Sequence, residues 1–214
     1  TYRYKVDIKK ENLEDFKTAI SSTVKSLSNS HKIEVSFGNQ TSNSEKNSIK
    51  LPDLERSGNK INFEEIRAIA DSKSLRLRFS NNKTLKKYEP QGNISKKLYS
   101  ISEKIRCEKI GTSYFKGVKD NIENFYQKRI LDLELKSSED KITESFENYL
   151  RVKFLDFKNE SQIDKKFKSY KKDLNDQFKS KISELKDSTL DQKKFNSLIS
   201  ELISNMSLDE NIDE

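Results

Sequence analysis

Apolar residues recur every three or four positions along most of this chain, which is the spacing of one helix face. The first such stripe predicts a helix that begins after Asn12, a suitable N-cap, and ends near Ser28–Ser30. Five residues form the stripe: Leu13, Phe16, Ile20, Val24 and Leu27. One side of this helix is therefore expected to be buried.

Two short stretches alternate between apolar and polar residues instead. The first contains Ile33, Val35 and Phe37, and the second contains Ile49 and Leu51 before Pro52. The polar, turn-rich stretch Gly38–Asn47 separates them. Alternation is typical of half-buried strands, so the sequence predicts a small β-hairpin after the first helix. A lone hairpin is marginal in water, and this one must therefore pack on a helix.

The middle of the chain returns to helical spacing. Asn62, with Glu65 three residues later, starts a predicted helix over Phe63–Phe79. Leu75, Leu77 and Phe79 would also suit a strand, but no turn residue interrupts the segment, and we favour the helix. Further helices are predicted over Ser95–Lys109 and Phe115–Leu135. Gly111 between them is a helix stop or a close-packing point.

Three more stripes occupy the last third, over Ile142–Phe157, Ile163–Leu185 and Phe195–Met206. Thr189 with Gln192 is expected to cap the third helix. The middle stripe would form one helix of roughly 35 Å, at about 1.5 Å per residue. That length suggests a helical hairpin or bundle that projects from the body.

Together these patterns predict a mostly α fold, with a small β-hairpin inserted after the first helix and long C-terminal helices. We expect an N-terminal helical domain over residues 1–136 and a long-helix bundle or hairpin over 137–206. Residues 207–214 lose the periodicity and turn acidic, which is typical of the start of a disordered linker.

The composition favours slender helices over a thick core, because 32% of the 214 residues are hydrophobic and 36% are charged. Eight Tyr and twelve Phe argue against full disorder. No apolar stretch approaches the ~20 residues that span a bilayer, and no signal-peptide pattern opens the chain. We therefore expect a cytoplasmic location.

The net charge of +7 is unevenly distributed. Residues 83–136 hold 13 Lys and Arg against 7 Asp and Glu, whereas residues 208–214 hold four acids and no base. A basic middle raises a nucleic-acid hypothesis. A solvated helical surface is favoured instead, because the basic residues form no run and no nucleic-acid motif accompanies them.

The chain offers few groups for catalysis. His31 is the single histidine and Cys107 the single cysteine, which leaves neither a thiolate–imidazole pair with supporting context nor a zinc site of the usual type. The five glycines have no phosphate-loop or dinucleotide spacing. We therefore expect no catalytic, cofactor or metal residues in this chain.

One segment, Ile66–Ile122, carries a recognisable arrangement of residues. Ala70-Asp71 precedes Leu75-Arg76-Leu77-Arg78 and Pro90, and Arg106, Glu108 and Gly111 precede Gly117-Val118 and Asn121. This arrangement resembles the N-terminal region of the CobT subunit of aerobic cobaltochelatase. There, an Ala-Asp, a Leu-x-Leu-Arg stretch and a Pro precede an Ala-Arg-x-Val-Glu-x-Ile-Gly core, a Gly-Val and an Asn. The family often has Arg-Gly and His-Asp where Arg67-Ala68 and Ser80-Asn81 stand here.

The resemblance implies a subunit of an ATP-dependent chelatase that inserts cobalt into a corrin during cobalamin biosynthesis. It implies two partners, a CobS-like AAA+ ATPase and a CobN-like large subunit that holds the tetrapyrrole. The parent complex would use ATP, magnesium and cobalt. The metal-adhesion site of the family is expected to lie outside this sequence, so this chain itself would bind no cofactor.

The segment that carries the resemblance is also the surface that we expect to contact a partner. We expect the exposed face of the Ser95–Lys109 helix and the Gly111–Asn121 connection to contact a partner, with Arg106, Glu108 and Asn121 as the polar contacts. The alternative is that these three residues only brace two antiparallel helices. A basic helical nucleic-acid-binding or scaffold protein is the other function left open.

Overall fold

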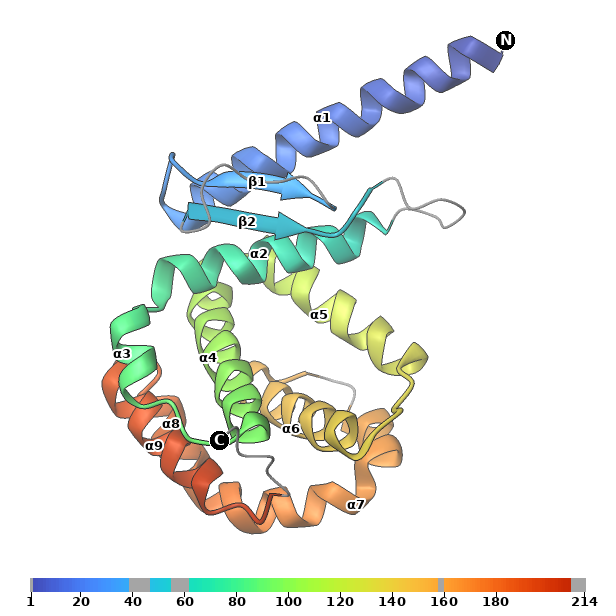
Figure 1. Ribbon diagram of the computed structural model, residues 1–214. Helices are drawn as coiled ribbons and strands as arrows, with labels where there is room; N and C mark the ends of the chain where they lie inside the picture. Colours follow the sequence, from blue (N-terminus) through green and yellow to red (C-terminus); the bar gives the residue numbers. More distant parts are fainter. Residues whose placement is uncertain (1, 39–46, 55–61, 158–159, 209–214) are drawn as a thin grey trace.

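The computed structural model describes residues 2–38, 47–54, 62–157 and 160–208, with the side chains of 2–11 and 160–164 left out. The described elements are helices joined by short connections, with two strands after the first helix (Figure 1). In chain order they are α1 (Tyr2–Ser28), β1 (Glu34–Phe37), β2 (Ser48–Leu51), α2 (Phe63–Phe79), α3 (Asn82–Lys87), α4 (Asn93–Tyr114), α5 (Lys116–Asp132), α6 (Ser138–Leu155), α7 (Glu160–Phe178), the 3-10 turn η2 (Lys179–Lys181), α8 (Ile182–Asp187) and α9 (Gln192–Ser204). The prediction of a mostly α fold is confirmed.

Both predicted strands are present, but they run parallel and do not form a hairpin. Val35 pairs with Ile49 and Phe37 with Leu51 in one two-stranded sheet. The hairpin prediction was wrong because alternation identifies a strand without fixing its direction. A parallel pair needs a connection long enough to return the chain to the start of the first strand. That connection begins at Gly38, whose φ of +61° is readily adopted only by glycine, and most of it lies outside the described residues.

The sheet, α1 and the first half of α2 share a small core. β1 and β2 lie beside α1 and α2 (Figure 1), and their inward side chains belong to the same core as side chains from both helices. The predicted N-cap of α1 was misplaced, since the helix begins at Tyr2 and Asn12 lies inside it. The buried members of this core are Ile20, Val24, Ile33, Phe37, Ile49, Leu51, Leu54, Ile66 and Ala70.

α2 and α4 confirm two of the sequence predictions and correct a third. α2 is helical to Phe79, and the Asn62 side chain accepts a hydrogen bond from the Glu65 N–H at 3.1 Å, as expected of its cap. α4 passes through Gly111 and ends only at Tyr114, so Gly111 is not a helix stop. It is a close-packing point, because a Cβ there would overlap the Leu75 side chain on α2. The short helix α3 was not predicted.

The C-terminal helices wrap around α4, on the side away from the sheet (Figure 1). The predicted helix over Ile163–Leu185 is interrupted after Phe178 by η2, and Phe167 has non-helical angles inside α7. α9 is capped by Asp191, whose side chain accepts from the Lys194 N–H, and not by Thr189. The result is a bundle that packs on α4 and not a projecting hairpin.

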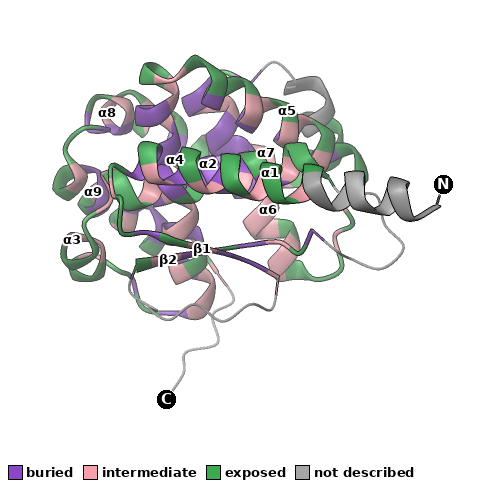
Figure 2. Ribbon diagram, turned by 90° about the horizontal axis from the view of Figure 1, so that it is seen from above, coloured by how far each residue is buried: buried purple, intermediate pink, exposed green. Residues whose placement is uncertain are grey.

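The larger core contains side chains from both sides of the expected boundary at residue 136. Leu75, Leu98 and Ile105 belong to it together with Phe146, Phe178 and Ile199. The two-domain division itself stays a prediction. Figure 2 shows that burial is concentrated on α4 and on the faces turned toward it. Among the described residues, no helix has the length and apolarity that a bilayer crossing requires.

Candidate functional site

α4 lies at the centre of the larger core, and few of its side chains reach the surface. Between Ser95 and Lys109 only Lys97 is exposed. α2, α5, α6 and α9 all pack against it. The charged side chains of the Glu103–Glu108 motif therefore point toward neighbouring helices, where burial of a charge is costly unless it is paired.

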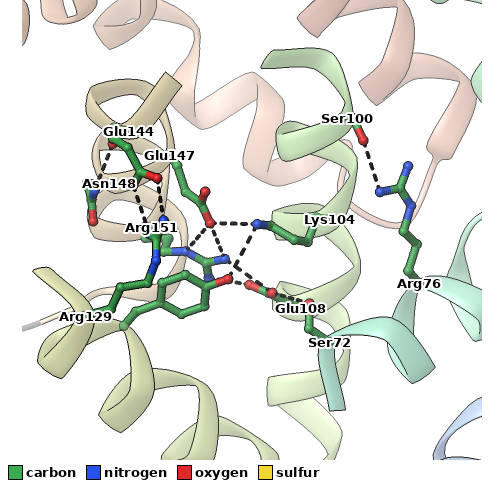
Figure 3. Close-up of polar contacts among 11 residues, drawn as sticks. Ser72, Arg76, Ser100, Lys104, Glu108, Arg129, Glu144, Glu147, Asn148 and Arg151 are labelled. Atoms are coloured by element: carbon green, nitrogen blue, oxygen red, sulfur yellow. Dashed lines mark hydrogen bonds and ion pairs between the residues drawn. The ribbon is translucent and has the colours of Figure 1, made fainter. Parts of the chain in front are cut away.

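The largest polar cluster joins α4 to α6 through Arg151 (Figure 3). This fully buried guanidinium forms an ion pair with Glu108 on α4 and donates to Glu147 on its own helix at 2.8 and 3.1 Å. Lys104 of α4 donates to the same Glu147 oxygen at 2.7 Å. Two carboxylates and two cations thus balance one another between the two helices.

Two further helices contact this cluster. Ser72 of α2 donates to Glu108 at 2.6 Å, and the centroid of the Tyr126 ring of α5 lies 3.4 Å from the Arg151 guanidinium carbon. A guanidinium over an aromatic face is attracted by the electrons of the ring, which strengthens the contact in a dry interior. The cluster therefore connects α2, α4, α5 and α6.

The electrostatics of the cluster favour its charged forms. Burial alone would raise the pKa of Glu147, but the adjacent Lys104 and Arg151 charges together hold that pKa well below its usual range. Burial would likewise lower the pKa of Arg151, yet Glu108 and its neighbours raise it. The pKa shifts of Glu147 and Arg151 thus favour the carboxylate and the guanidinium that form the salt bridge between them.

A second cluster lies on another side of α4. Arg106 forms a two-bonded ion pair with Glu103 at 2.8 and 2.9 Å and donates to the backbone carbonyls of Thr189 and Phe79 at 2.8 and 2.6 Å. Asn196 of α9 donates to Glu103 at 2.9 Å. Arg106 thereby holds the ends of α2 and α8 against α4, and all three side chains are almost completely buried.

The third pair joins α2 to α5. Asn121 donates to the buried Asp71 carboxylate at 2.8 Å. Burial raises the pKa of Asp71 to about 6, although the Asn121 hydrogen bond and the Arg67 charge oppose the shift. Among the described residues, Glu103, Glu108 and Glu147 each form an ion pair with a buried arginine, whereas Asp71 forms no ion pair.

The structure thus separates the three predicted contact residues. Arg106 and Glu108 are two positions apart on α4, about 200° around the helix, and so they face different neighbours. Arg106 is 1% exposed and Glu108 is fully buried, while Asn121 is half-buried. These positions match the bracing alternative, and the role of the three residues in partner contact stays a prediction.

Several members of the clusters were not anticipated from the sequence. Glu147 and Arg151 were missed because charged residues are normally assigned to the solvated face of a helix. One signal was available. Glu147 and Arg151 are four residues apart and flank the buried stripe residues Tyr149 and Leu150. A charged pair at that spacing inside an apolar stripe can indicate an internal salt bridge.

The described residues show no arrangement suited to metal binding, since no three His, Cys, Asp or Glu side chains gather there. His31 is exposed. Burial, with the Glu103 charge, raises the pKa of the Cys107 thiol far above its usual range. A protonated, buried thiol is a poor nucleophile and a poor metal ligand.

Comparison with known proteins identifies one family. The family model described as "Cobalamin biosynthesis protein CobT" matches residues 10–214, nearly the whole chain. No solved structure matches the chain.

Proposed function

Because the chain belongs to the CobT family of cobalamin biosynthesis proteins, we propose that it is a non-catalytic helical module of a cobaltochelatase subunit. The module docks on partner subunits that carry out ATP-dependent cobalt insertion into a corrin. The family match over residues 10–214 is the observation that carries this proposal.

The placement of the motif residues supports a scaffold role. Arg106 and Glu108 each bind neighbouring helices, Asn121 binds Asp71, and Gly111 allows α4 to approach α2. The polar groups most characteristic of the resemblance are thus engaged in holding five helices together. Their chemistry is used to shape the surface that a partner meets.

The exposed part of the α4–α5 connection is the surface that we propose for docking. Tyr114 is 68% exposed at the end of α4, and Lys116, Lys119 and Asp120 follow it on the surface. A Tyr side chain contributes both apolar area and a hydroxyl, which is why Tyr is enriched at protein interfaces. Gly111 and Val118, on either side of this connection, are buried.

In this proposal the chemistry resides on other subunits. A CobS-like AAA+ ATPase hydrolyses ATP with magnesium, and a CobN-like large subunit binds the corrin that receives cobalt. The cobalt is a substrate of the complex and is not a resident metal of this chain.

A pull-down with matched surface variants tests the proposal. The immobilised chain is mixed with the purified ATPase subunit and, separately, with the large subunit, and we expect it to retain at least one. Tyr114→Ala should weaken that retention by about tenfold or more, the loss typical of an interface anchor. Leu190→Ala is the matched control, since Leu190 is 77% exposed before α9 and should have no effect. Failure of the wild-type chain to retain either subunit would reject the docking role.

A further inference from the structure

A cleft lies between β2 and the C-terminal half of α2, away from the buried clusters. Its volume is about 260 Å³, and Ser48, Ile49 and Lys50 of β2 line it together with Lys73, Arg76 and Leu77 of α2.

The β2 side of this cleft is the open edge of the sheet. Leu51 accepts a hydrogen bond from the Gly38 N–H at 2.9 Å, so the backbone groups of Leu51 point toward β1. Successive residues of a strand turn these groups to opposite sides, which points those of Lys50 and Ser48 into the cleft. The Lys73 ammonium occupies part of this edge by donating to the Lys50 carbonyl at 2.6 Å.

The cleft is positively charged. Lys50, Lys73 and Arg76 line it, and no Asp or Glu does so. Among the described residues, no carboxylate forms an ion pair with any of the three cations. Their observed partners are neutral, since Lys73 binds a carbonyl and Arg76 donates to the Ser100 hydroxyl at 3.1 Å.

An apolar side chain lies among these cations. Leu77 is 43% exposed and is one of the few large apolar residues that the described surface presents. The cleft therefore combines the outward backbone groups of β2, three cationic side chains and one apolar contact. A segment that adds a strand to a sheet edge uses main-chain hydrogen bonds for affinity and side-chain contacts for specificity. The cations add a preference for acidic side chains.

We propose that this cleft binds an extended, acidic segment of a partner protein. The segment lies along β2, its carboxylates pair with Lys50, Lys73 and Arg76, and an apolar side chain contacts Leu77. Lys73 exchanges the Lys50 carbonyl for a carboxylate, and this releases the strand edge to the incoming backbone. Until then, a lysine at the edge protects it from pairing with other chains.

Short peptides test the charge and the conformation together. The probe is a blocked octapeptide of alternating glutamate and valine, added to the ¹⁵N-labelled chain at low salt. We expect the largest amide shift changes at Ser48 and Lys50, because they form the open edge. A glutamine–valine peptide should bind about tenfold more weakly or worse, since up to three ion pairs are removed. Equal binding by a lysine–valine peptide would overturn the proposal.

Charge-reversal variants locate the contact. Lys50→Glu changes an exposed side chain that forms no ion pair among the described residues, so this variant should keep the fold. Lys50→Glu and Arg76→Glu should each weaken peptide binding by about threefold to tenfold. Lys141→Glu is the matched control, because this exposed lysine lies on α6. Wild-type affinity in Lys50→Glu would place the peptide elsewhere. Displacement of the peptide by a single-stranded DNA oligonucleotide that binds more tightly would assign the cleft to nucleic acid and overturn the proposal as well.

The inference rests on the proposed docking role but can fail separately from it. If the chain retains a partner subunit and Lys50→Glu retains it equally well, the cleft is not the contact and the docking role stands. If the peptide binds along β2 while neither subunit is retained, the cleft is confirmed and the docking role is rejected.

Discussion

Substitution of Arg151 by methionine removes the centre of the largest buried polar cluster. Arg151 is 0% exposed and is bonded to Glu108 and Glu147, with its guanidinium against the Tyr126 ring. Methionine retains most of the volume and the apolar stem but provides neither the charge nor the donors. Lys104 would then be the only cation left to balance two carboxylates.

The expected cost follows from the imbalance. Removal of one partner of a buried ion pair typically costs about 3–5 kcal/mol, because the remaining charge stays desolvated without compensation. Domains of ordinary stability unfold with about 5–15 kcal/mol, so Arg151→Met should lose a large fraction of the free energy of unfolding. The apolar contacts of the methionine offset part of this loss, which favours the lower end of the range.

Urea denaturation followed by circular dichroism measures this loss, and Arg129→Met provides a matched control. Arg129 also forms a two-bonded pair with a glutamate, Glu144, but its side chain is 32% exposed. Solvent screening should limit that loss to about 1 kcal/mol. The double variant Glu108→Gln/Arg151→Met should recover part of the stability, because it restores the charge balance. Equal costs for Arg151→Met and Arg129→Met would refute the reasoning.

Three further predictions concern single side chains. Burial raises the pKa of Asp71 to about 6, so its ionisation opposes folding as the pH rises from about 4 through 6. Asp71→Asn should therefore stabilise the protein by up to about 3 kcal/mol at pH 8 and hardly at pH 4. Urea unfolding at both pH values measures the difference. Gly111→Ala should cost about 1–3 kcal/mol, because its methyl group overlaps the buried Leu75; an unchanged melting temperature would show that Leu75 can move aside. Asp191→Ala removes the cap of α9 and should cost about 1 kcal/mol in thermal unfolding, whereas Leu190→Ala should be neutral.

Helix positions could be predicted from the sequence where an apolar stripe and a cap coincide. Asn62 and Glu65 give both signals, and α2 begins where they place it. The break after Phe178 could not be predicted, because Lys179–Lys181 contains no proline or glycine and the apolar spacing continues across it. The direction of β2 relative to β1 depends on tertiary packing, which alternation within each strand does not encode.

The sequence identified some residues of the buried clusters, but it did not predict that their side chains point inward. The sequence singles out Arg106 and Glu108 by their resemblance to a family pattern, but charge alone suggests solvent exposure. Their burial depends on partners distant in sequence, such as Thr189 for Arg106 and Arg151 for Glu108. Such partners are recognised only when the helices have been placed side by side.

Sedimentation velocity with the separate chelatase subunits tests the docking role most directly. The chain is mixed with the CobS-like ATPase in the presence of ATP and magnesium, and with the CobN-like large subunit, while ATP hydrolysis by the chain alone is recorded in parallel. We predict a faster-sedimenting complex with at least one subunit and no hydrolysis by the chain alone. Free sedimentation in both mixtures, or ATP hydrolysis by the isolated chain, would contradict a non-catalytic docking module.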